Sequence, residues 1–173
     1  GGMAEALVLN GDTLFQCDVD ALLRFARERC ADIGMILNAV PDAARFGRVN
    51  CDQAGRVIAF QEKGVRAPGL INAGVYYVKA SVFDGAPGLA FGFEQEILMK
   101  RISRLAIYAL PTDAYFIDIG IPEDLARAQH EGVKAQDVFR VFTGLWVDVG
   151  DLDGIQLGLV VCQAKQGGAR FSP

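Results

Sequence analysis

Two aspartates stand at the ends of apolar, β-prone runs, in positions that favour a shared cation. Asp12 closes the run Leu7-Val8-Leu9-Asn10-Gly11-Asp12, and Asp118 closes Tyr115-Phe116-Ile117-Asp118 just before Ile119 and Gly120. Carboxylates at the ends of neighbouring strands face the crevice where α/β folds bind ligands, and hard divalent cations prefer such oxygen donors. We therefore expect chemistry on a phosphate-bearing substrate.

Other polar motifs follow strands in the same way. Glu62-Lys63-Gly64 ends one β-prone run, where a lysine suits a phosphate and a glutamate suits sugar hydroxyls. Asn72 and Gly74 interrupt another apolar run, and a glycine inside a strand marks a bulge or a closely approaching ligand. Each motif alone also fits an ordinary turn, a solvated charge pair or a bulge without a ligand.

Composition narrows the classes of protein. The 173 residues suffice for one domain, about half of them are apolar, and the net charge is −4. Lys and Arg are scattered and no apolar run nears the roughly 20 residues of a membrane span, so we expect neither a nucleic-acid nor a membrane partner. Without a C-x-x-C and with His130 as the only histidine, zinc is disfavoured; we expect free thiols in a reducing, cytoplasmic compartment, at Cys17, Cys30, Cys51 and Cys162.

Hydrophobic periodicity predicts the elements that position these residues. Asp18 is placed as the N-cap of a helix that reaches Cys30, and Pro122 as the first residue of a helix that runs to Gly132. A strand before and a strand after the first helix imply a crossover and a parallel pair. The remaining expected elements are a helix over 94–102, a hairpin of 48–52 with 56–61 around Gly55, and strands over 6–10, 33–40, 70–78, 105–110 and 115–119.

In order and spacing, these motifs, together with Arg45-Phe46-Gly47, resemble the sugar-phosphate nucleotidyltransferase family. The likeness covers roughly Ala6 to Glu131 and is greatest to branches acting on D-glycero-D-manno-heptose 1-phosphate or mannose 1-phosphate with a guanine nucleotide. The motifs are Asn10-Gly11-Asp12, Arg45-Phe46-Gly47, Glu62-Lys63-Gly64, Asn72-Ala73-Gly74 and Phe116-Ile117-Asp118-Ile119-Gly120-Ile121-Pro122.

The resemblance implies an α/β fold with a Rossmann-like mixed β-sheet flanked by helices, of the nucleotide-diphospho-sugar transferase type, truncated at the N-terminus. Residues 4–132 would form the part that binds sugar phosphate and metal, and residues 133–173 an unassigned tail. The implied reaction transfers a nucleoside monophosphate from a nucleoside triphosphate to a sugar 1-phosphate. It yields an NDP-sugar of the GDP-heptose or GDP-mannose type, for cell-surface polysaccharide such as lipopolysaccharide, and pyrophosphate.

The resemblance also implies roles for single residues. Asp12, Asp118 and Lys63 would be catalytic, with the two aspartates holding Mg²⁺ and the lysine neutralising the sugar-linked phosphate. The implied substrate-binding residues either contact sugar hydroxyls or admit the substrate close to the backbone: Gly11, Gly47, Glu62, Asn72, Gly74 and Glu94. Asp148, in Trp146-Val147-Asp148-Val149-Gly150, has a local sequence similar to that of Asp118 and competes with it as the second metal ligand. Pro122 and the following helix favour Asp118 for this role.

One family feature does not occur, namely the Gly-x-Gly-x-Arg loop that cradles the triphosphate. We therefore expect a fragment that does not transfer a nucleotide on its own, and a truncated sheet whose open edges favour a homo-oligomer. A non-catalytic homologue with regulatory or structural function stays open, and the coding DNA upstream of Gly1 distinguishes it from a truncation. A metal-dependent glycosyltransferase would need Asp18-Val19-Asp20 as a ligand pair, although this motif falls at a predicted helix start.

Overall fold

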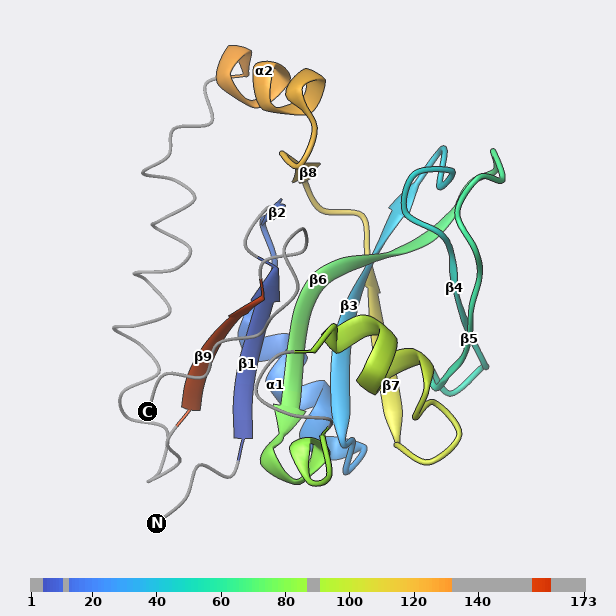
Figure 1. The fold of residues 1–173 in the computed structure, drawn as a ribbon, viewed down its shortest axis with the longest axis vertical. Coiled ribbons are helices and arrows are strands. Elements are labelled where there is room, and N and C mark those ends of the chain that lie inside the picture. The colour runs from blue at the N-terminus through green and yellow to red at the C-terminus, as the bar shows by residue number, and fades with distance from the viewer. Residues whose placement is uncertain (1–4, 11–12, 87–90, 132–156, 163–173) are drawn as a thin grey trace.

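The fold is built on a mixed five-stranded sheet with the strand order β7-β3-β6-β1-β9 (Figure 1). A computed structural model describes residues 5–10, 13–86, 91–131 and 157–162 of the chain. Strand β6 runs antiparallel to both of its neighbours, whereas β7 pairs parallel with β3, and β9 pairs parallel with β1. The strands are β1 Glu5–Asn10, β3 Ile33–Val40, β6 Gly69–Lys79, β7 Ile107–Thr112 and β9 Leu157–Cys162.

The predicted crossover exists, but its two strands are not neighbours. Helix α1, Val19–Glu28, joins β1 to β3, and Asp18 caps it by accepting a hydrogen bond from the Ala21 amide at 2.8 Å. Both strands run in the same direction, yet the eleven-residue β6 lies between them and pairs with each. The expected parallel pair is therefore wrong as a pairing, because a strand later in the chain takes the central place.

Different helical segments cover the two faces of the main sheet (Figure 1). Leu7 and Leu9 of β1 pack on the face that carries α1, together with Leu22 and Leu23 of that helix. The alternate residues of the sheet pack on the opposite face, with Phe93, Ile97 and Leu98. This period-two division of one strand between two cores is what a central strand covered on both faces requires.

The helical segment on the second face differs from the expected one. It is π-helical, spans Phe93–Met99, and the Lys100 amide donates to the Gln95 carbonyl, five residues back, at 3.2 Å. A helix was predicted over 94–102, so its type and its end differ. A 3₁₀ turn, Ala80–Phe83, follows β6 directly.

Two small sheets lie beyond the main one. Strands β4, Val49–Cys51, and β5, Val57–Phe60, form the predicted hairpin. Strands β2, Thr13–Phe15, and β8, Phe116–Asp118, pair antiparallel. Helix α2 follows as Pro122–His130, which confirms the proline at its start, while the predicted end at Gly132 and the 146–150 motif lie outside the described residues.

The segment left unassigned by sequence contributes a strand, since the backbone of β9 pairs along its whole length with β1. The three cysteines whose side chains are described, Cys17, Cys30 and Cys51, are free thiols, as expected. Burial raises the pKa of the Cys17 thiol to about 11. In the part of the chain that the structure describes, no helix has the length and apolar character needed to cross a membrane.

Gly34 sets how closely α1 approaches the sheet. A Cβ at this position would lie 2.7 Å from the Ala26 Cβ and 3.3 Å from the Leu22 Cδ1. We predict that Gly34→Ala lowers the free energy of unfolding by about 1–3 kcal/mol, because a rigid helix must move away from β3. Gly92→Ala is the matched control, since its Cβ would meet only Gln95 atoms at 3.8–3.9 Å. Equal urea midpoints for the two variants would contradict the prediction.

Candidate functional site

The centre of the candidate site is the end of β8, where Asp118 lies. The Asp118 carboxylate is held by the Gly120 amide, which donates to Oδ1 at 2.8 Å, and its side chain is 25% exposed. In the β2–β8 pair, Thr13 is the register partner of Asp118. Asp12 and Gly11 precede Thr13 in the chain and lie outside the described residues. The sheet thus brings the segment that follows Asp12 to Asp118.

Arg45 contacts the same carboxylate from a different part of the chain. Its guanidinium lies 3.4 Å from Asp118 Oδ2 and forms a second, closer ion pair with Asp124 in the first turn of α2. Arg127, one turn further along α2, pairs with the other oxygen of Asp124 at 3.0 Å. The hydrogen bond from Arg45 holds the pKa of the Asp124 carboxyl below its usual value.

Aromatic packing fixes the loop that carries Arg45. The Phe46 ring packs edge-to-face on the Phe116 ring of β8, with centroids 5.5 Å apart, and Phe116 packs similarly on Phe15 of β2. The Arg45 guanidinium also lies 5.0 Å from the Phe46 ring centroid. The Arg45-Phe46-Gly47 motif predicts a role for its glycine only, whereas the structure shows that Arg45 contacts Asp118. The signal in the sequence is that this arginine belongs to the same motif as Gly47.

Lys63 and Glu62 lie on an exposed loop after β5. This loop is bonded to the loop of Arg45, since the Gly64 amide donates to the Ala44 carbonyl at 2.7 Å. Gly47 has a φ of +75°, and a Cβ there would lie 2.5 Å from the Gln61 carbonyl oxygen. The structure therefore places three predicted residues on two adjoining loops, and Gly47 is required by the contact between them.

A second polar cluster joins two further predicted residues, Asn72 and Glu94. The Asn72 side-chain amide donates to Glu94 Oε1 at 2.7 Å and to the Tyr76 hydroxyl at 2.5 Å. The Tyr76 hydroxyl in turn donates to Glu94 Oε1 at 3.3 Å, and the rest of this tyrosine is fully buried. An amide and a carboxylate held side by side suit the recognition of neighbouring hydroxyls. Tyr76 was not among the predicted site residues.

Gly74 forms a bulge, which is one of the two alternatives that a glycine inside this strand indicated. Its φ is +74°, and the pairing of β3 with β6 shifts register beside it, between Met35 and Leu37. The Gly74 amide donates to Asn72 Oδ1 at 3.1 Å, so the bulge also orients that amide. A Cβ on Gly74 would lie 2.7 Å from the Asn10 side-chain nitrogen. The close approach that requires glycine here is made by Asn10 of the same chain.

Oxygen donors at Asp118 match the preference of magnesium for a few carboxylates completed by water and phosphate. Within the described ranges, no three His, Cys, Asp or Glu side chains gather closely enough to hold a metal ion, so the fit rests on Asp118 and its neighbourhood. The competing Asp18-Val19-Asp20 motif has a structural use instead, because Asp18 is the N-cap of α1.

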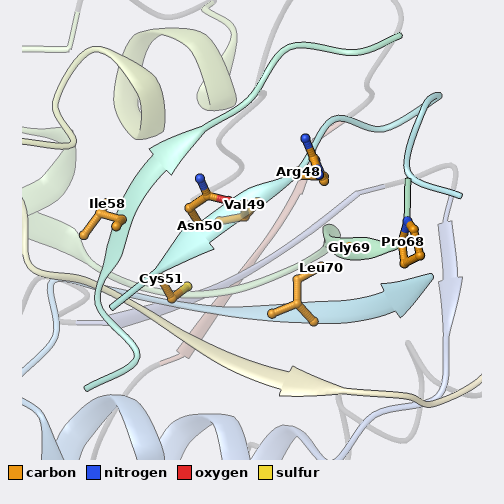
Figure 2. Close-up of a pocket in the computed structure, with 8 residues that line it drawn as sticks. All are labelled: Arg48, Val49, Asn50, Cys51, Ile58, Pro68, Gly69 and Leu70. Carbon is orange, nitrogen blue, oxygen red and sulfur yellow. The ribbon is translucent and has the colours of Figure 1, made fainter. Parts of the chain in front are cut away.

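A separate hollow of about 490 Å³ lies between the β4–β5 hairpin and the start of β6 (Figure 2). It is open, and none of the predicted site residues is among those that line it: Arg48, Val49, Asn50, Cys51, Ile58, Pro68, Gly69 and Leu70. The carboxylate of Asp118 and the Asn72–Glu94 cluster are therefore the better candidates for chemistry.

The fold is that of nucleotide-diphospho-sugar transferases: a mixed sheet with helices on both faces, as solved relatives also have. HddC from Yersinia pseudotuberculosis superposes with a TM-score of 0.65 at 31% identity, over 74% of this chain and 55% of that one. The sequence profile of the nucleotidyl transferase family matches residues 2–157. The chain belongs to this family, as the sequence motifs indicated.

Guanylyltransferases are among its similar relatives. The chain is 39% identical to the D-glycero-alpha-D-manno-heptose 1-phosphate guanylyltransferase of Aneurinibacillus thermoaerophilus, over 73% of this chain and 55% of that protein. It is 36% identical to the mannose-1-phosphate guanylyltransferase of Mycobacterium tuberculosis, over 75% of this chain and 37% of that protein. The chain therefore spans about half the length of the first of these relatives, and less of the second.

The Tyr76 hydroxyl is predicted to stabilise the cluster of Asn72 and Glu94. Tyr76→Phe removes one buried hydrogen-bonding group and leaves the ring in place, so we expect the free energy of unfolding to fall by about 1 kcal/mol. Tyr108→Phe is the control, because its hydroxyl has no hydrogen-bond partner among the described residues. Urea unfolding of both variants measures the difference, and equal losses would show that the cluster does not depend on the hydroxyl.

Asp124 is predicted to stabilise the fold in a pH-dependent way. Its pKa is lowered in the folded state by the Arg45 hydrogen bond, so its stabilisation is fully present above its unfolded pKa, near 4, and is lost as pH falls through the lower folded value. We expect Asp124→Asn to be less stable than the wild type at pH 7, with the gap narrowing below about pH 4. Urea midpoints between pH 2.5 and 7 test this, and a constant gap would count against it.

Proposed function

We propose that this chain is the sugar-phosphate and metal-binding part of a sugar 1-phosphate nucleotidyltransferase. The reaction joins a sugar 1-phosphate oxygen to the α-phosphorus of a nucleoside triphosphate and releases pyrophosphate. The observation that carries the proposal is the pairing of Thr13 with Asp118, because it brings the segment directly after Asp12 to the second acid of the family motif. Similarity to guanylyltransferases supports a product of the GDP-heptose or GDP-mannose type.

The residues at the end of β8 would bind the charged part of the substrates. Asp118 and Asp12 would hold magnesium, which when bound supplies charge neutralisation for the phosphates. Lys63, on the loop bonded to that of Arg45, would neutralise the phosphate of the sugar. In-line transfer of this kind needs positioning and charge more than a protein nucleophile, and the proposed roles here are all of that kind.

The cluster on β6 would bind the sugar. Asn72 and Glu94 are already bonded to each other and share the buried Tyr76 hydroxyl, so their polar atoms are held in place before a ligand arrives. Glu62 would add a further contact from its exposed loop. The lack of a side chain at Gly74 lets the Asn10 side chain approach the bulge closely. Asn10 thus links this cluster to the end of β1, which precedes Thr13 in the chain.

The role of the product, the cellular compartment, the oligomeric state and the activity of the isolated chain are proposals as well. We propose that the product would serve the synthesis of cell-surface polysaccharide and that the chain acts in the cytoplasm. A homo-oligomer is proposed because an outer strand of the main sheet, such as β9, can pair with a second copy of the chain. The absence of a Gly-x-Gly-x-Arg motif from the 173 residues supports binding of the sugar phosphate without nucleotide transfer by this chain alone.

Titration calorimetry with mannose 1-phosphate in the presence of Mg²⁺ tests this function. We expect weak binding that Lys63→Met lowers at least fivefold, since the substitution removes the positive charge that would pair with the phosphate. Lys100→Met is the matched control, because Lys100 forms an exposed ion pair with Glu96 of the π-helical segment Phe93–Met99. Free mannose is expected to bind more weakly still. Equal affinity for mannose and its phosphate, or equal affinity of the two lysine variants, would refute the assignment.

Nucleotide transfer is measured separately. We expect no pyrophosphate release when the chain is mixed with GTP, mannose 1-phosphate and Mg²⁺. Release above a protein-free blank would contradict the proposed inactivity of the isolated chain, while still supporting the reaction class.

A further inference from the structure

We infer that Arg45 competes with the metal ion for Asp118, and that Asp124 limits this competition by holding the guanidinium. The inference rests on the proposed function, since it takes Asp118 as a metal ligand. It adds a residue that sets metal affinity and to which the family motifs assign no role. Arg45 would be a positioning residue, acting on the metal through the carboxylate.

The contacts of Arg45 are unequal. Nη2 lies 3.4 Å from Asp118 Oδ2, near the long limit for a hydrogen bond, whereas Nη1 makes a much shorter contact with Asp124. Asp118 Oδ1 is already engaged by the Gly120 amide, so Oδ2 is the oxygen that both the guanidinium and a cation would use. A cation on Oδ2 therefore meets a positive charge within a few ångströms.

The partners of Arg45 are arranged so that it can leave Asp118 without becoming unpaired. Asp124 sits in the first turn of α2 and is only 14% exposed, and it also accepts from Arg127. The Arg45 side chain is 43% exposed and lies against the Phe46 ring. Movement of one guanidinium arm would break the long contact and keep the short one, so metal binding costs one weak ion pair.

Two substitutions should shift metal affinity in opposite directions. Arg45→Met keeps the aliphatic length and removes the charge, so the cation meets less repulsion and affinity should rise about fivefold. Asp124→Asn removes the competing negative charge, so the guanidinium moves toward Asp118 and affinity should fall about threefold. A purely structural role of this ion pair would weaken binding in both variants.

The probe is Mn²⁺, counted as the free ion by electron paramagnetic resonance at pH 7 and constant ionic strength. Arg127→Met is the matched control, because it removes a nearby positive charge that contacts Asp124 and leaves the contact of Arg45 with Asp118 in place. It should change affinity by less than about twofold. The double variant Arg45→Met/Asp124→Asn should bind as tightly as Arg45→Met, since Asp124 acts only through the arginine. Circular dichroism confirms that each variant is folded.

Several outcomes would overturn the inference. They are an Arg45→Met affinity no higher than that of Arg127→Met, a double variant as weak as Asp124→Asn, and Mn²⁺ binding that survives unchanged in Asp118→Asn. If Asp124→Asn does not fold, the comparison of Arg45→Met with Arg127→Met decides alone. The titration with mannose 1-phosphate reports on the proposed function independently, so intact sugar-phosphate binding with unchanged Mn²⁺ affinities would reject the role of Arg45 only.

Discussion

The short pairing of β2 with β8 is the constraint on which the candidate site depends. Three residues of β2 lie opposite three residues of β8. Thr13 with Asp118 is the pair at the carboxyl end of β8. Asn10, at the end of β1, lies beside Gly74. After it, Thr13 pairs with Asp118, which precedes α2. The Phe15, Phe116 and Phe46 rings pack in sequence across the pair, so the apolar contacts that hold it also hold the loop of Arg45.

Local elements could be predicted because their signals are local. Asp18 caps a helix whose apolar residues recur at helical spacing, and Pro122 opens another; the structure has both. The hairpin of β4 and β5 and the bulge at Gly74 follow from glycine at the positions that need it. Strand β9 was missed, since its pairing with β1 depends on a partner far away in the chain.

Order within the sheet could not be predicted for the same reason. The motif of strand, helix and strand correctly gave the direction of β1 and β3, but nothing in those residues indicates that β6 lies between them. Residue type and motif identified Asn72 and Glu94 as candidate site residues. They did not predict the hydrogen bond between the two side chains. Arg45 contacts Asp118 and Tyr76 contacts Glu94, each distant in sequence, and only the fold shows these contacts.

The two polar clusters differ in how their charge is balanced, and this difference bears on what each can bind. Around Asn72, the Glu94 carboxylate accepts from a neutral amide and a neutral hydroxyl and has no ion-pair partner among the described residues. Around Asp118, two carboxylates share Arg45, and Asp124 also has Arg127. The longest of these contacts is the one on Asp118. Under the proposed function, a cation on Asp118 would displace the longest of these ion pairs, whereas a cation on Asp124 would displace two shorter ones.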